Sequence, residues 1–152
     1  MNVYYTIMEI YAEDINYWKT GRTSPDGWID KAKAQIEKLD GRILAEAFGS
    51  EPTTGRSAYM LGFEVQGNRF KAIWPVLPTK SRKNEKAARI QAATMLYHDI
   101  KAKCIAATVK GARVAFFEYL MLPDGRIASE ASEKELSDGI PSILLTYNQS
   151  LD

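Results

Sequence analysis

The most regular alternation of apolar and polar residues flanks Gly67-Asn68, near the middle of the chain. Runs rich in β-branched and aromatic residues, 57–66 and 69–76, lie on either side of this pair. Gly-Asn favours the tight two-residue turns that close β-hairpins. We therefore expect a hairpin in which Gln66 and Arg69 form the closing pair.

This register gives the hairpin one polar and one apolar face. Glu64 opposes Lys71 on the polar face, as a cross-strand ion pair. The apolar face holds Tyr59, Leu61, Phe63, Val65, Phe70, Ala72, Trp74 and Val76. A face of this composition is typical of a sheet that covers a core, so we assign its aromatic rings to packing rather than to stacking on nucleic-acid bases.

Further segments have the composition of strands. Residues 3–11 and 42–48 are rich in β-branched, aromatic or aliphatic side chains, and 114–122 is a third apolar run. A Pro-Asp-Gly turn at 123–125 would lead into a short return strand at 126–129. Together with the hairpin, these segments predict an antiparallel sheet of about four to six strands.

Two segments show the spacing of an amphipathic helix. The first, 25–39, follows Ser24, whose hydroxyl can accept a hydrogen bond from the free amides of the first turn. The longer one, 85–109, follows the potential cap residue Asn84 and ends before Gly111. Its apolar stripe contains Ala93, Leu96, Tyr97, Ile100, Cys104 and Ala107. The sequence thus predicts a single α+β domain of 152 residues, with the sheet packed against one long and one shorter helix.

Composition narrows the class of protein. Hydrophobic residues make up 45% and charged residues 26%, as in ordinary globular domains. The single cysteine, Cys104, can form neither an internal disulfide nor a zinc cluster, which is typical of a reducing compartment. Acidic residues follow the N-terminus, and the longest apolar run is too short for a membrane helix. We expect a cytoplasmic location and no membrane partner.

The net charge of +1 conceals a strong segregation of charge. Residues 56–113 carry twelve cations and three acids, a formal +9, whereas the rest of the chain carries eight cations and sixteen acids, a formal −8. The densest cations lie at and before the start of the second helix, and two more lie on the polar face of the hairpin. They are Lys80, Arg82, Lys83, Lys86 and Arg89, with Arg69 and Lys71. Cations at a helix start are suited to holding phosphate.

Catalytic chemistry has little support in the sequence. His98 is the only histidine, and no acid or nucleophile lies at a spacing that would orient it. The Glu-x-Lys triplet of metal-dependent nucleases and the glycine-rich loops that cradle nucleotides do not occur. We predict no catalytic residues, no metal and no cofactor, which favours a protein that is not an enzyme.

One short stretch is similar to a known family. Residues 85–93 resemble the last helix of double-stranded RNA-binding domains, and 25–108 share that family's expected order of helix, three strands and helix. The resemblance implies that Lys86 and Arg89, with Lys83 in the preceding loop, contact backbone phosphates. The likeness covers about ten residues, and the loop between the first two strands lacks the family's histidine, so we assign no family.

Three classes of function remain open. The first is a small nucleic-acid-binding protein that contacts the phosphate backbone through the basic loop and helix start. The second is a protein-interaction or inhibitor module in which the basic surface meets an acidic partner, either another protein or the acidic ends of its own copies in a homo-oligomer. The third is a protein that binds a small molecule or nucleotide.

Overall fold

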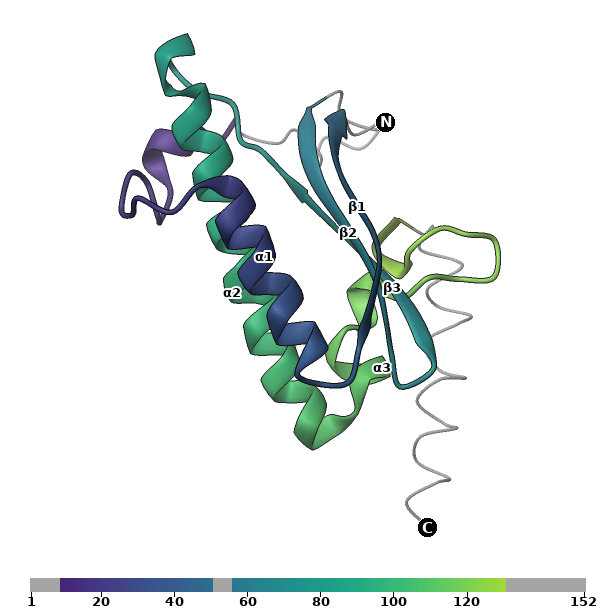
Figure 1. Ribbon diagram of the computed structural model, residues 1–152. Coiled ribbons are helices and arrows are strands. Elements are labelled where there is room, and N and C mark those ends of the chain that lie inside the picture. The colour runs from purple at the N-terminus through teal and green to yellow at the C-terminus, as the bar shows by residue number, and fades with distance from the viewer. Residues whose placement is uncertain (1–8, 51–55, 131–152) are drawn as a thin grey trace.

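The computed structural model describes residues 9–50 and 56–130 (Figure 1). Three antiparallel strands, β1 (Arg42–Ser50), β2 (Ser57–Val65) and β3 (Asn68–Pro75), form a sheet in that order. Two helices, α1 (Pro25–Glu37) and α2 (Glu85–Lys110), lie side by side and cover one face of it. The α+β class with one long and one shorter helix is confirmed. The sheet has three strands in the described ranges, fewer than the expected four to six.

Local signals in the sequence account for the helix ends. The Ser24 hydroxyl accepts a hydrogen bond from the Gly27 amide at 3.1 Å, and Pro25 occupies the first turn, where no amide donor is needed. α2 ends at Gly111, whose φ of 87° is a conformation that favours glycine. α1 ends two residues before the expected Leu39, which lies in the following turn.

The hairpin is present, but its expected register is wrong by two residues, so that each residue of β2 pairs with the residue two positions earlier in β3. The turn residues are Gln66 and Gly67, both with positive φ, so Val65 pairs with Asn68 and Glu64 with Arg69 rather than Lys71. A contact outside the hairpin accounts for the difference, since the Gln66 side chain accepts a hydrogen bond from the Ala112 amide at 2.8 Å. Side chains alternate between the two faces of a strand with a period of two, so a shift of two residues leaves every side chain on its expected face.

The strand expected at 114–122 is a second error. That segment folds into two short helical pieces, α3 (Ala112–Ala115) and the 3₁₀ turn η4 (Phe117–Tyr119), and then forms single bridges at Leu120 and Met121. Phe116 lies between the helical pieces, and the centroid of its ring is 5.2 Å from that of Phe63 and 5.3 Å from that of Phe70. Burial of this ring in the core favours the compact conformation over an extended one.

The return after 123–125 is confirmed only as a bridge between Met121 and Ile127. Within the expected strand 3–11, residues 9–11 are not extended into a sheet, and residues 3–8 lie outside the described part of the chain.

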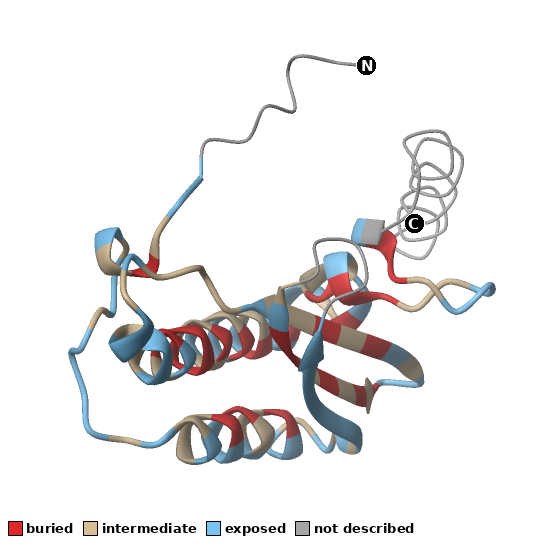
Figure 2. Cartoon of the chain, turned by 90° about the horizontal axis from the view of Figure 1, so that it is seen from above, coloured by how far each residue is buried: buried red, intermediate tan, exposed pale blue. Residues whose placement is uncertain are grey.

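The core lies between the helices and the sheet. Figure 2 shows the buried positions of α2, β2 and β3 turned towards one another, whereas β1 is almost entirely exposed at the sheet edge. The aromatic residues assigned to packing behave accordingly, because Tyr59, Phe63 and Phe70 are buried and Trp74 is half-buried. No helix in the described ranges has the length and apolar character required to cross a membrane.

Candidate functional site

The cations before α2 surround a groove of about 410 Å³. The groove lies between the sheet end where β3 finishes, the loop that follows it and the first turns of α2. Its uncharged lining comprises residues 76–79, with Ser57, Ser81 and Ala88. Its charged lining comprises Arg56, Lys80, Arg82, Arg89 and Glu85, a formal charge of +3. The fold therefore concentrates positive charge in a cleft rather than spreading it over the surface.

Five of the seven expected site residues lie at this end of the molecule. Lys80, Arg82 and Arg89 line the groove, and Lys83 and Lys86 lie beside it on the 3₁₀ turn η3 (Arg82–Asn84) and the first turn of α2. All five residues are exposed. Arg56, immediately before β2, also lines the groove, although it is not among the site residues expected from the sequence.

The two hairpin cations lie elsewhere. Arg69 is at the opposite end of β3, six residues and therefore about 20 Å from Pro75, and contacts Glu64 at 3.5 Å. Lys71 lines a shallow hollow with Met60 and Ile73. Neither residue belongs to the groove.

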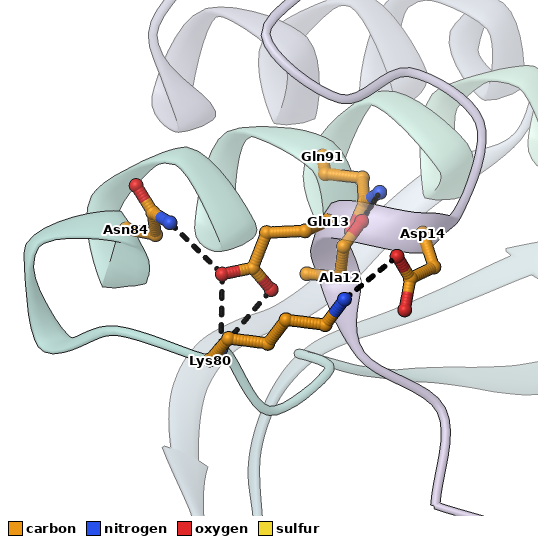
Figure 3. Close-up of polar contacts among 6 residues, drawn as sticks. All are labelled: Ala12, Glu13, Asp14, Lys80, Asn84 and Gln91. Carbon is orange, nitrogen blue, oxygen red and sulfur yellow. Dashed lines mark hydrogen bonds and ion pairs between the residues drawn. The ribbon is translucent and has the colours of Figure 1, made fainter.

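An acidic turn from the N-terminal part of the chain holds the basic loop in place (Figure 3). The turn is η2 (Ala12–Asp14), and the carboxylate of Glu13 accepts hydrogen bonds from the Lys80 amide at 2.9 and 3.1 Å and from the Asn84 side chain at 2.8 Å. Asp14 forms an ion pair with the Lys80 ammonium at 3.0 Å and thereby raises the pKa of Lys80. The charge of Lys80 is thus partly compensated. Asn84 makes no side-chain capping bond, contrary to expectation.

Gln91 anchors the same turn to α2. Its side chain is buried, and its amide nitrogen lies 2.8 Å from the carbonyl oxygen of Ala12, 3.2 Å from that of Ile15 and 3.0 Å from that of Asn16. Sequence reasoning missed this contact, which joins segments about 75 residues apart. The available signal was a polar residue one helical turn from Ala88, on the buried side of α2.

Several cations in and beside the groove have no acidic partner among the residues that the structure describes. In the described ranges, no ion pair or side-chain hydrogen bond engages Arg82, Lys83 or Lys86. Arg89 instead lies with its guanidinium 5.1 Å from the centroid of the Phe48 ring. All four of these cationic residues are exposed to solvent.

The remaining candidates for chemistry do not form a reactive centre. His98 is exposed and its ring stacks on Tyr17 at 4.9 Å. Cys104 is buried, and burial raises the pKa of its thiol to about 11. Among residues 9–50 and 56–130, no group of three or more histidine, cysteine or acidic side chains could hold a metal ion.

A second hollow, of about 510 Å³, has a different character. It lies along the edge of β3 and is lined mainly by apolar side chains, including Ile73, Trp74 and Met95. Glu118 and Tyr119 supply its polar edge. None of the described residues in its lining is a cation, so this hollow does not extend the basic groove.

Comparison of the chain with protein-family models, with curated proteins and with solved structures finds no match. The function is therefore inferred from the groove and its surroundings.

Proposed function

We propose that the protein binds the phosphate backbone of nucleic acid without catalysing a reaction. The observation that carries this proposal is the gathering of Arg56, Lys80, Arg82 and Arg89 around one groove. Among the described residues that line it, Glu85 is the only acid. Phosphodiesters carry one negative charge per nucleotide, and arginine binds two phosphate oxygens at once through its planar group.

The surroundings of the groove support the same ligand. Lys83 and Lys86 add two exposed cations beside it, and no acid in the described part of the chain pairs with either. The groove lies at the N-terminal end of α2, where the helix dipole adds a partial positive charge. A chain of phosphates would contact several of these groups at once, whereas an isolated anion would contact only one or two.

Salt dependence tests the proposal. Anisotropy titrations of a fluorescent oligonucleotide, from about 20 to 200 mM salt, should show a slope of log affinity against log salt of about −3 to −4, as expected for four phosphate contacts. Arg82→Ala and Arg89→Ala should each make the slope shallower by about 1.

Arg69→Ala supplies the matched control, because Arg69 is also an exposed arginine but lies at the far end of β3. It should leave the slope unchanged. Absence of binding at 20 mM salt, or an equal effect of Arg69→Ala and Arg82→Ala, would refute the proposed site.

One observation favours an acidic protein as a second candidate partner. The carboxylates of Glu13 and Asp14 already contact the basic loop, so its geometry accepts acidic side chains. Light scattering and competition by a polyglutamate peptide separate the two cases. A homo-oligomer that excludes nucleic acid, or a peptide that binds more tightly than an oligonucleotide of equal charge, would favour the protein partner.

A further inference from the structure

An exposed aromatic ring lies beside the basic groove. Phe48 is on the edge strand β1, opposite Tyr59 of β2, in the row of residues that continues to Trp74 of β3. Tyr59 is 8% exposed, whereas Phe48 is 42% exposed because the sheet ends at β1. The row runs from the half-buried Trp74 through the buried Tyr59 to an exposed phenyl ring at Phe48.

Two contacts hold this ring in place and connect it to the groove. The Tyr59 ring supports it, with a centroid distance of 4.7 Å, and the guanidinium of Arg89 lies over it at 5.1 Å. Arg89 also lines the groove, so a phosphate bound there would lie within one side chain's reach of Phe48. An exposed apolar residue by itself is ordinary, but an exposed ring paired with a cation of the proposed phosphate site is more specific.

We infer that the protein recognises single-stranded nucleic acid, with one base stacking on the Phe48–Arg89 pair. This inference rests on the proposed function. Both the phenyl ring and the planar guanidinium are surfaces on which bases stack, and every base has a face that suits them. The bases of a duplex are already stacked on one another, so their faces are not accessible to this pair.

A site that recognised charge alone would prefer a duplex to a single strand. A duplex carries one negative charge per about 1.7 Å of its axis, a higher density than a single strand, and a site that contacts only phosphates gains more from the duplex. A preference for the single strand therefore requires a contact with the bases. Phe48 is positioned to make that contact without reading sequence.

The experiment compares three probes of equal length on the full chain: oligothymidine, an abasic oligonucleotide with the same phosphates, and a duplex. Oligothymidine should bind at least about fivefold more tightly than the abasic strand, the ratio expected for one stacked base. It should also bind more tightly than the duplex at the same salt concentration.

Variants at position 48 identify the stacking residue. Phe48→Leu keeps an apolar side chain but removes the aromatic face, and should lower oligothymidine affinity about fivefold while leaving abasic affinity within about twofold. Phe48→Trp should retain the preference. Leu44→Ala is the matched control, since Leu44 is 41% exposed on the same strand and should have no effect.

The outcomes separate this inference from the proposed function. Equal binding of oligothymidine and the abasic strand, or an equal loss for both in Phe48→Leu, would overturn base stacking and leave phosphate binding intact. If no probe binds, both the inference and the proposed function are wrong.

Discussion

Replacement of Gln91 by methionine tests how the basic loop is held. The substitution keeps the length of the side chain but removes its polar atoms. Gln91 is 1% exposed, and its amide nitrogen serves carbonyl groups of Ala12, Ile15 and Asn16. Methionine leaves these three oxygens without their donor.

The loss of folding stability differs among the three carbonyl groups that lose their donor. A carboxamide has two N–H groups, so at most two strong bonds are lost. Ala12 is 0% exposed, and an acceptor left unsatisfied at such a position costs about 1–3 kcal/mol. The bonds to Ile15 and Asn16 are only partly buried, and these oxygens can return to water, which limits their loss to about 1 kcal/mol. After about 1 kcal/mol is regained from added apolar burial, we expect a net destabilisation of about 2 kcal/mol.

Urea denaturation and thermal unfolding measure this cost. For a chain of 152 residues, about 2 kcal/mol corresponds to a fall in Tm of about 4–8 °C. Loss of the anchor should also release the turn locally, so trypsin should cleave after the exposed Lys19 faster than in the wild type.

Thr94→Val provides the matched control on the same helix. Thr94 is also buried, at 4% exposed, but its hydroxyl donates to the carbonyl of Ile90, within its own helix. That carbonyl keeps its helical amide donor, so we expect a loss below about 1 kcal/mol. If Gln91→Met lies within about 0.5 kcal/mol of the wild type and cleavage after Lys19 is unchanged, the anchoring role assigned to Gln91 is wrong.

Three further predictions concern titrating groups. Because burial raises the pKa of Cys104 to about 11, the thiol should resist a disulfide reagent at pH 8 and react only after urea is added. Desolvation alone would raise the pKa of Glu13, but hydrogen bonds from Asn84 and the Lys80 amide outweigh it and lower that pKa. Its stabilising contribution is therefore complete above about pH 4.5 and is lost as the pH falls further, so Glu13→Gln should flatten the fall of the urea midpoint between pH 5 and 3. Tyr119→Phe removes a hydrogen bond to the Asp99 carboxylate and should cost about 1.5 kcal/mol in urea denaturation; stability equal to the wild type would contradict this.

Elements encoded by neighbouring residues could be predicted from the sequence. Ser24 and Gly111 mark helix ends through their own side chain or backbone, and the alternation along 57–76 gives the faces of the hairpin. The register depended on Gln66, whose side chain bonds the distant Ala112 amide, and no local pattern contains that bond. The strand expected at 114–122 failed for the same reason, because the packing of Phe116 between two distant rings outweighs β-propensity.

In the candidate site too, features encoded by neighbouring residues could be predicted, whereas those that depend on distant contacts could not. The cluster at 80–89 is local in sequence and stays together in the fold. Arg69 was correctly expected on the polar face of the hairpin, but the face does not specify the position along the strand, and Arg69 lies at the wrong end of it. The contact between Glu13 and Lys80 joins residues 67 positions apart, so composition could reveal only that opposite charges were available.

The irregular pattern of apolar and polar residues in β1 indicates that Phe48 is exposed. Ile43, Ala45 and Ala47 alternate with Leu44, Glu46 and Phe48, so neither set is uniformly apolar or polar. A central strand has at least one consistent face, whereas an edge strand with a bulge does not require one. The register shift in β1 occurs between Ile43 and Ala45, which leaves Leu44 unpaired and places Glu46 and Phe48 on the helix-covered side at the open edge. A ring that shares its side of an edge strand with a carboxylate is expected at the surface, so the sequence pattern of β1 by itself favours an exposed Phe48.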